Sequence, residues 1–589
     1  MKIGGASGYW GDSARSTPQL LGANVDVLVY DYLAEITMSL LARARMKDPE
    51  KGGYARDFVT EAMAPHLAQI AEKKVKVLSN AGGVNPKACA EALRQLVKEK
   101  GLDLTVAVVE GDDLIGRKEE IAKGGPPEMF SGKAFPHPAA IVSMNAYLGA
   151  VPIAKALDAG ADIVVTGRCV DSALTLGALM HRFGWPANDY DLLAVGSLVG
   201  HLLECGAQAT GGNFTDWRDV PDRAHIGYPI AEVSPDGAAR ITKPDGTGGL
   251  VSRETVAEQL LYEIGDPSDY QLPDVRCDFT NVIIAEDGEG GVVVSGAKGR
   301  APSPRLKVSA THLSGWRGGL TPSFYGFEAA EKAEAFANDA VERAQERLEG
   351  AGLPPFTEVS TEVLGSGTQF GEGGEADEVV LKLAVRHPDA EGVGALLKEA
   401  AGLGLSAPPG LCGFAGTRPK PSPVVELFSF LIPKEDVEPN YDTGDGPIRV
   451  PFTAGSDSRA EPVSTEIASP SGDEPMVTVL LIEAAVARSG DKGNDANIGV
   501  IARHKDILPY LWAQLTENVV AERFAHVLEG PVERYLMEGS GAINFVLKKS
   551  LGGGGIASLR NDPQGKGFSQ VMLTIPVRVP ERLLAEVLP

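Results

Sequence analysis

The stretch ADIVVTGRCVDS, residues 161–172, contains a short apolar run followed by a tight polar turn. The run, residues 162–166, is rich in Ile and Val and predicts a buried strand. Gly167 and Arg168 end the strand, and a helix is expected over residues 173–183, capped by Asp171 and Ser172. A strand, a tight turn and a helix N-terminus present N–H groups to an anion, and the Arg168 guanidinium adds permanently charged donors. The stretch therefore predicts a ligand-binding turn at the edge of a sheet, in which Arg168 and Asp171 are candidate catalytic residues that orient the ligand.

A second polar stretch, VGHLLECGAQATGGNF at residues 199–214, begins within a predicted helix over residues 194–208. His201, Glu204 and Cys205 are spaced i, i+3 and i+4, which places them on one helical face. Cys205 beside His201 is a candidate thiol–imidazole nucleophile, and plain packing of that face is the alternative. Glu204 is a candidate general acid or base, because a partly desolvated carboxyl group can titrate near neutral pH. The flexible residues that follow are candidate ligand contacts: Gly211, Gly212 and Asn213.

Earlier in the chain, short apolar runs alternate with helical segments, which is typical of an α/β fold with a doubly wound, largely parallel sheet. The expected strands cover residues 2–6, 24–30, 75–79 and 104–109. Ligands bind outside the carboxyl ends of such strands, and polar or glycine-rich turns occupy these ends here. The candidate ligand-binding residues in the turns are Gly5, Ser7, Gly8, Asp12, Asn80, Gly82, Gly83, Asn85, Gly167 and Ser172. Plain structural turns are the alternative interpretation.

Acidic residues at the strand ends are candidates for acid–base chemistry. Glu110 and Asp112 lie at the end of the strand over residues 104–109 and are candidate catalytic carboxyl groups. The same run could bind Mg²⁺ through oxygen ligands, but this is the minority interpretation, and HLLEC matches no zinc-ligand spacing. We therefore predict no metal site. Asp31 follows the strand over residues 24–30 and is interpreted as a complement to the dipole of the next helix.

The remainder of the chain predicts further structural units. A single helix is expected over residues 138–159, with Asn145 and Tyr147 inside it. Alternating apolar residues and a charged helix downstream predict an α+β extension built on antiparallel strands. The expected division is an α/β domain over residues 1–280, an α+β extension over 281–437, a linker over 438–475 and a small α+β domain, ferredoxin-like, over 476–589.

Two polar loops in the C-terminal domain, RSGDKGN and SLRNDPQGK, concentrate positive charge in an otherwise acidic chain. Loops of this composition can hold phosphate groups, including those of coenzyme A, through charge-assisted hydrogen bonds. Solvated loops, or loops that only bury an interface, are the alternatives. The candidate ligand-binding residues are Arg488, Ser489, Asp491, Lys492, Arg560 and Lys566.

The composition narrows the function classes. A formal net charge of -24 over 589 residues argues against a nucleic-acid partner, which requires clustered Lys and Arg. No apolar stretch reaches the length of a membrane span, and no signal-peptide core is present, so we expect a soluble cytoplasmic protein without a membrane partner. Five scattered cysteines without a CxxC pair fit a reducing compartment.

Several long runs resemble one known family. IGGASGYWGD, NAGGVNP, VVEGDDL, ADIVVTGRCVDSAL and GHLLECGAQATGGNF are similar to the acyclic terpene utilisation (AtuA-like) family. VARSGDKGNDANIGVIAR and SLRNDPQGK resemble the smaller C-terminal domain that accompanies it. The resemblance covers nearly the whole chain and is strongest over the first 280 and the last 110 residues.

The resemblance implies a role in the breakdown of acyclic terpenes, whose intermediates are CoA thioesters. We therefore expect a homo-oligomeric enzyme that acts on a small acyl-CoA or organic acid by a lyase or hydratase-type step, with coenzyme A as part of the substrate and no further cofactor. In this hypothesis Arg168 and the glycine-rich turns bind the carboxylate or thioester oxygens. The alternatives are a non-catalytic acyl-CoA-binding or assembly partner of a carboxylase and, more weakly, a metal-dependent thioester hydrolase.

Overall fold

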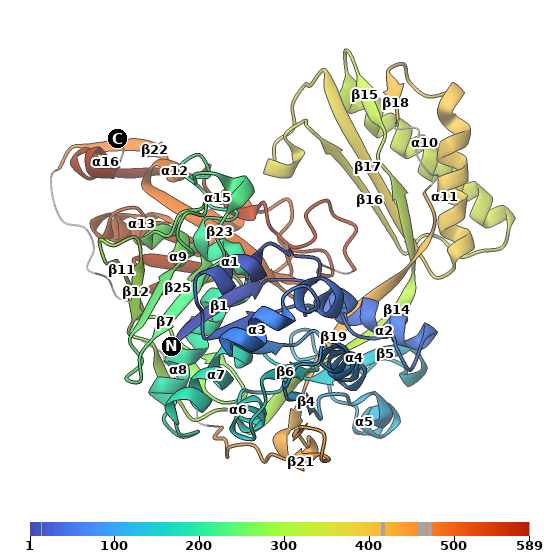
Figure 1. Cartoon of the computed structure of the whole chain (residues 1–589). Coiled ribbons are helices and arrows are strands. Elements are labelled where there is room, and N and C mark those ends of the chain that lie inside the picture. The colour runs from blue at the N-terminus through green and yellow to red at the C-terminus, as the bar shows by residue number, and fades with distance from the viewer. Residues whose placement is uncertain (13, 414–418, 458–466, 468–473, 556, 588–589) are drawn as a thin grey trace.

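The computed structural model describes residues 1–12, 14–413, 419–457, 467, 474–555 and 557–587 (Figure 1). At its centre lies an eleven-stranded sheet, in which five neighbouring strands are parallel. Their order across the sheet is β1 (Lys2–Ser7), β2 (Val27–Tyr30), β3 (Lys76–Ser79), β6 (Ile163–Thr166) and β4 (Val106–Glu110). These strands confirm the predicted α/β class, because runs buried on both faces are the pattern of parallel strands.

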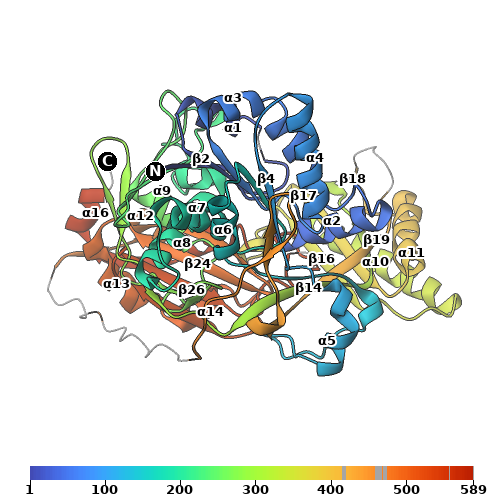
Figure 2. The same ribbon diagram turned by 60° about the horizontal axis from the view of Figure 1, so that its bottom comes forward.

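Helices cover both faces of the parallel strands (Figure 2). One face is covered by α1 (Ser16–Gly22), α2 (Glu35–Lys47), α3 (Leu67–Lys73) and α4 (Pro86–Glu99). The other face is covered by α6 (Val151–Asp158), α7 (Ala173–Phe183) and α8 (Tyr190–Glu204). Because β6 lies between β3 and β4, the direction of winding reverses there, and the carboxyl ends of these strands flank a switch point where open α/β sheets bind ligands.

Antiparallel strands extend the sheet at both edges. Beside β1 they are β7 (Ile230–Val233), β8 (Ala239–Thr242), β12 (Val292–Ser295) and β11 (Ile283–Glu286). Beside β4 they are β20 (Asn440–Asp442) and β21 (Ile448–Arg449). The main sheet thus extends beyond the predicted boundary at residue 280 and into the predicted linker over 438–475. These segments form strands because they hydrogen-bond to edge strands that are distant in sequence. Most of the second half of that linker lies outside the described residues.

A second sheet forms the extension, and α10 (Ala329–Gly350) and α11 (Ala390–Gly402) cover one of its faces (Figure 1). Its long strand β14 (Arg305–Leu320) connects this extension to the main body. The other strands are β15 (Ser323–Tyr325), β16 (Glu358–Leu364), β17 (Glu378–His387), β18 (Leu411–Cys412), β19 (Ser422–Pro433) and β5 (Ile141–Ala146).

Strand β5 corrects one prediction. The helix predicted over 138–159 is wrong in its first half, since residues 141–146 pair with β14 and only α6 is helical. Pro152 stands in the first turn of α6, where its missing N–H costs nothing, so the helix begins at that point. Asn145 and Tyr147 therefore lie in and just after a strand.

The C-terminal domain is a four-stranded antiparallel sheet with short helices on one face. The sheet order is β23 (Ala485–Lys492), β24 (Asp495–Ala502), β26 (Ala542–Leu547) and β25 (Val532–Met537). A separate pair is formed by β22 (Met476–Leu480) and β27 (Pro576–Pro580). The helices are α12 (Leu481–Ala484), α13 (Leu508–Gln514), α14 (Glu517–Arg523), α15 (Phe568–Met572) and α16 (Glu581–Val587).

The uncovered face of this sheet packs on α9 (Arg253–Leu261) of the N-terminal region. Gly499 has no room for a side chain there, since a Cβ would meet the side chain of Leu261. Two buried amides fix the contact: the Asn497 Nδ2 donates to the Leu261 carbonyl, and the Asn544 Nδ2 donates to the Ile264 carbonyl (2.9 Å). Since buried polar groups are costly unless paired, these bonds specify one docked arrangement.

Among the described residues, we find no helix that combines the length and the apolar character required to cross a bilayer.

Candidate functional site

Side chains from the carboxyl ends of β2, β3 and β6 meet at the switch point. Asp31 follows β2 and is buried, and its Oδ1 accepts hydrogen bonds from the Asn80 Nδ2 (2.7 Å) and the Leu33 N (3.1 Å). Burial raises the pKa of Asp31 well above its usual range, Asp171 raises it further, and Arg168 lowers it. The structure therefore places Asp31, which the sequence analysis assigned to a helix dipole, in the candidate site.

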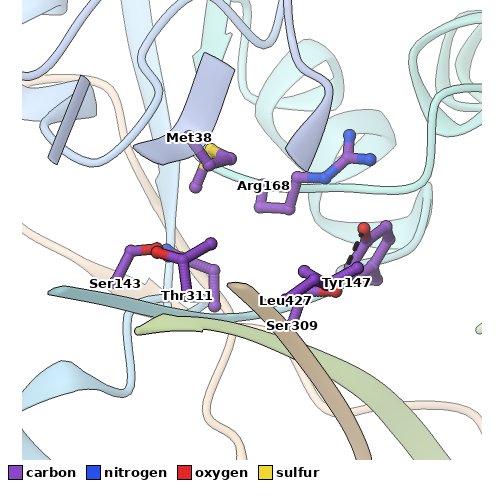
Figure 3. Close-up of a pocket in the computed structure, with 8 residues that line it drawn as sticks. Met38, Ser143, Tyr147, Arg168, Ser309, Thr311 and Leu427 are labelled. Carbon is purple, nitrogen blue, oxygen red and sulfur yellow. Dashed lines mark hydrogen bonds between the residues drawn. The ribbon is translucent and has the colours of Figure 1, made fainter. Parts of the chain in front are cut away.

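Arg168 lies at the centre of this rim and is buried. Its Nη1 donates to the Asp171 Oδ1 (2.6 Å) and to the Cys169 carbonyl (3.0 Å). The guanidinium stacks over the ring of Tyr147, 4.3 Å from its centroid. A small cavity of about 10 Å³, partly open to solvent, adjoins these side chains. Met38 of α2 lies on the same side of this cavity as Arg168, across from Thr311 (Figure 3). An arginine held by stacking and by two acceptors is pre-oriented to bind an anionic or carbonyl oxygen.

Asp112 builds the turn that carries Arg168. The buried Asp112 Oδ2 accepts hydrogen bonds from the Arg168 N and from the Asn145 Nδ2, both 2.8 Å long. Its carboxylate also lies where a Cβ on Gly167 would be, so this turn requires glycine at 167. Burial raises the pKa of Asp112 to about 7. Asp112, a predicted catalytic residue, is thus placed behind the rim, in contact with the main chain of Arg168.

His201 and Glu204 form a buried pair near the C-terminus of α8. The His201 Nδ1 lies 2.9 Å from the Glu204 Oε1, and the His201 Nε2 lies 3.1 Å from the Leu260 carbonyl. Since a carbonyl can only accept, Nε2 carries a proton, and a second proton lies between Nδ1 and Glu204. Burial alone would lower the pKa of His201, but Glu204 raises it; burial raises the pKa of Glu204. The two side chains therefore share one proton between the His201 Nδ1 and the Glu204 Oε1.

The C-terminal domain completes the surroundings of this pair. Strand β23 runs along the N-terminal region: Arg488 donates to the Asn213 carbonyl (3.0 Å), and Gly490 packs on the ring of Tyr262. Lys492, at the end of β23, therefore lies close enough to lower the pKa of both Glu204 and His201. The ring of Tyr270 in β9 (Tyr270–Gln271) stands 6.1 Å from that of His201. One cation of the predicted C-terminal loops thus joins the rim.

Cys205 does not form the thiol–imidazole pair that the spacing predicted. Both ring nitrogens of His201 are engaged, one by Glu204 and one by the Leu260 carbonyl. Burial raises the pKa of the Cys205 thiol well above its usual range, so the thiol stays protonated and is a weak nucleophile. The reason is geometric: Cys205 follows the last residue of α8, where the helical face ends.

Other parts of the chain occupy the space beside the glycines of the predicted ligand-binding turns. A Cβ on Gly5 would lie 2.6 Å from the Leu203 carbonyl oxygen, and one on Gly8 would lie 2.7 Å from the main chain of Cys205. These glycines let β1 and its turn pack against the end of α8. Similar contacts within 3.0 Å occur at the other predicted glycines, Gly82, Gly83, Gly167, Gly211 and Gly212.

Most of the remaining predicted polar residues stabilise these turns. Asp12 accepts from the Gly8 N (2.9 Å) and the Tyr228 hydroxyl (2.6 Å). The Asn80 Oδ1 accepts from the Tyr32 N (2.7 Å). The others are Ser7, which donates to the Asp31 carbonyl, Asn85, which caps α4, and Glu110, which pairs with Lys87.

The predicted cap of α7 differs from the observed one. Ser172 occupies the cap position without a side-chain hydrogen bond, and its main chain packs against Gly200 of α8. Asp171 instead pairs with Arg168, and about a third of its side chain is exposed. This pairing is favoured because a guanidinium offers a charged donor in place of a main-chain N–H.

The other candidates in the C-terminal domain are engaged away from the rim. Arg560 donates to the Val527 carbonyl and pairs with Glu529 (both 3.0 Å). Lys566 contacts the Tyr262 hydroxyl and pairs with Asp491 (3.4 Å), while the Ser489 hydroxyl donates to the Gly565 carbonyl. The two polar loops are thus held together by their own charges.

Sequence reasoning missed Tyr147 and Tyr270 as site residues and undervalued Asp31. For Asp31 a signal was present, because it follows a strand exactly as the other rim residues do. Tyr147 was hidden by the helix predicted over 138–159, and no local pattern distinguishes Tyr270. In the part of the chain that the structure describes, no three His, Cys, Asp or Glu side chains form a group suited to a metal ion.

Comparison with known proteins gives two matches to family models. Residues 1–443 match the acyclic terpene utilisation family protein AtuA, and residues 479–578 match the AtuA ferredoxin-like domain. No protein of curated function and no solved structure matches the chain. Because the first match covers well over half of the sequence, the chain belongs to the AtuA acyclic terpene utilisation family and carries the ferredoxin-like domain of that family at its C-terminal end.

Proposed function

We propose that the protein is an enzyme of acyclic terpene utilisation that acts on the CoA thioester of a branched acid by a lyase or hydratase-type step. The family match supports the pathway context. The observation that carries the proposal is the largely buried His201–Glu204 pair, which shares a proton near the cation Lys492. Arg168 belongs to the same rim, because Arg168 and Glu204 both act on the pKa of Asp31. Titratable groups with shifted pKa values are typical of catalytic sites.

Glu204 is the member of the pair that exchanges the proton with substrate. Its side chain is 14% exposed, whereas that of His201 is 2% exposed and fully bonded. Adding water across a double bond next to a thioester, or eliminating water to form that double bond, requires a proton transfer at carbon. It also requires stabilisation of the negative charge that develops on the thioester oxygen. Glu204 performs the transfer with His201 holding the proton, and Arg168 or Lys492 stabilises the oxygen.

The test is turnover of branched acyl-CoA esters by the purified chain. Glu204→Gln keeps the hydrogen bond to His201 but cannot exchange the proton, so we expect turnover to fall by about 10²–10⁴. Glu529→Gln, at a carboxylate that pairs with Arg560 far from the pair, is the matched control and should retain full turnover. Equal turnover by the wild type and Glu204→Gln removes the pair from the mechanism.

One observation favours a second candidate, a non-catalytic acyl-CoA-binding or assembly partner of a carboxylase. The cavity beside Arg168 has a volume of about 10 Å³, room for about one water molecule and far below the roughly 300–1,000 Å³ of typical small-molecule sites. A surface that binds only part of a ligand requires no larger cavity. If this role is correct, the purified chain binds acyl-CoA in a calorimetric titration but turns none of it over.

A further inference from the structure

The two carboxyl oxygens of Asp31 have different surroundings. The Oδ1 accepts hydrogen bonds from the Asn80 Nδ2 (2.7 Å) and the Leu33 N (3.1 Å). In the part of the chain that the structure describes, no hydrogen bond reaches the Oδ2, and this oxygen is not among the enclosed polar atoms that lack a partner. The Oδ2 is therefore accessible at the rim, although only 4% of the residue is exposed.

These hydrogen bonds also decide which oxygen can donate. Burial raises the pKa of Asp31 well above its usual range, which favours the neutral carboxylic acid. A protonated carboxyl group has one O–H donor, and two N–H donors already occupy the Oδ1. The proton is therefore carried by the Oδ2, the oxygen that faces the rim.

The end of β1 links Asp31 to Glu204. The Asp31 N donates to the Ser7 carbonyl (3.2 Å), and the Ser7 hydroxyl donates to the Asp31 carbonyl. Gly8 follows and packs against Cys205, where a Cβ would lie 2.7 Å from the main chain. Glu204 directly precedes Cys205, and 14% of its side chain is exposed. Two partly accessible carboxyl groups thus lie at the same rim.

We propose that Asp31 is the general acid of the reaction and protonates a hydroxyl group that leaves from the substrate. This inference rests on the proposed function and narrows its substrate to a CoA thioester with a hydroxyl group on the β-carbon. Loss of water from such an ester requires a base at the carbon next to the carbonyl and an acid at the departing oxygen.

The two carboxyl groups divide the step between them. With the shared proton on the His201 Nδ1, Glu204 is ionised and accepts the proton of the carbon next to the carbonyl. The electron pair of that C–H bond forms the double bond, the carbon–oxygen bond breaks, and the Asp31 Oδ2 donates its proton to the hydroxyl group, which leaves as water. Glu204 then returns a proton to solvent, Asp31 takes one up, and hydration follows the same path in reverse.

Replacing the leaving group tests this assignment in the full chain. Asp31→Asn keeps an Oδ1 for both hydrogen bonds but has no acidic proton, so loss of water from a branched β-hydroxyacyl-CoA should fall by about 10²–10⁴. Loss of fluoride from the matching β-fluoroacyl-CoA should stay close to the wild-type rate, because fluoride leaves without a proton. Asp26→Asn, at an exposed carboxylate before β2 that accepts from the Lys2 N (2.7 Å), is the matched control and should behave like the wild type with both esters.

The outcomes separate this inference from the proposed function. Glu204→Gln should lose both eliminations, since the base serves both esters. Unchanged loss of water in Asp31→Asn, or an equal loss of both activities, overturns the role of Asp31 and leaves the proposed function in place. A wild type that acts on neither ester contradicts the proposed function and the step assigned to Asp31 with it.

An infrared measurement tests the acid without any substrate. The difference spectrum between the wild type and Asp31→Asn at neutral pH should contain the C=O stretch of a carboxylic acid. The difference spectrum between the wild type and Asp26→Asn should lack this band. If the band is missing from the first spectrum as well, Asp31 is ionised and the proposal is overturned.

Discussion

The rim of the parallel strands and the polar loops of the C-terminal domain use the same residue types with different results. At the rim, Asp31 and Asp112 are buried and Glu204 is largely buried, and burial is the largest cause of the raised pKa of each carboxyl group. In the C-terminal loops, Lys566 and Arg560 pair with nearby carboxylates. Burial thus dominates at these rim carboxyl groups, whereas Lys566 and Arg560 in the loops are partly exposed and ion-paired. This difference supports the rim, and not these loops, as the place of the proposed chemistry.

The largest expected effect concerns Asp112 at the rim. The folded state keeps the Asp112 proton up to about pH 7, whereas the unfolded chain loses it near pH 4, so the free energy of unfolding falls as pH rises between these values. Asn cannot ionise, so Asp112→Asn should remove this loss of stability. The loss is at most about 4 kcal/mol, because the pKa differs by about three units between the folded and unfolded states and one unit corresponds to about 1.4 kcal/mol. Urea unfolding at several pH values measures it.

Asp113→Asn is the control for this prediction, because Asp113 is half-exposed and pairs with Arg45 (2.9 Å). The buried Glu258, whose pKa burial raises to about 7, adds a loss of the same sign to every variant and cancels in the comparison. The same pH dependence in the wild type and Asp112→Asn would contradict the assignment.

The next effect concerns domain docking. Asn544→Ala removes the donor to the Gly265 carbonyl (2.7 Å) and one of the two acceptors of the Asn497 Nδ2, which keeps its bond to the Leu261 carbonyl. The free energy of unfolding should therefore fall by about 1–3 kcal/mol. The exposed Asn518 provides the control, Asn518→Ala, with no expected change. If both variants melt alike, the amide pair is not what holds the domains together.

A smaller effect distinguishes Arg168 at the rim from Arg560 in the C-terminal domain. Arg168→Lys retains the charge but loses the bidentate hydrogen-bond donors and the stacking on Tyr147. Stabilisation by a bound acyl-CoA should therefore fall by about 1 kcal/mol. Arg560→Lys should leave that stabilisation unchanged. Thermal shifts with and without ligand measure both, and an equal response of the two variants contradicts the assignment of Arg168 to the site.

The smallest effect tests whether the C-terminal domain reaches the rim. Lys492 lowers the pKa of both Glu204 and His201, so Lys492→Met should shift the pH profile of turnover to higher pH. Lys566→Met, at a lysine engaged by Tyr262, should leave the profile in place. NMR titration of the His201 ring provides a second measurement, and an unshifted titration in Lys492→Met shows that this lysine does not act on the pair.

The sequence by itself determined the parallel strands, their polar carboxyl ends and the placement of His201 and Glu204 on one helical face. These features are local: a buried strand is visible in five consecutive residues, and spacing of i and i+3 brings two side chains together on any helix. The resemblance to the family also rests on contiguous runs, and the family match confirms it.

Only the tertiary structure decided which candidates meet. Strand β5 exists because its partner lies far along the chain, with Ser143 bonded to Thr311 across 168 residues. The burial of Asp31, the bond of the His201 Nε2 to the Leu260 carbonyl and the approach of Lys492 depend in the same way on segments distant in sequence. Burial and long-range pairing set the pKa values of a site and decide which of its donors are engaged. Burial and long-range pairing cannot be read from a local sequence pattern.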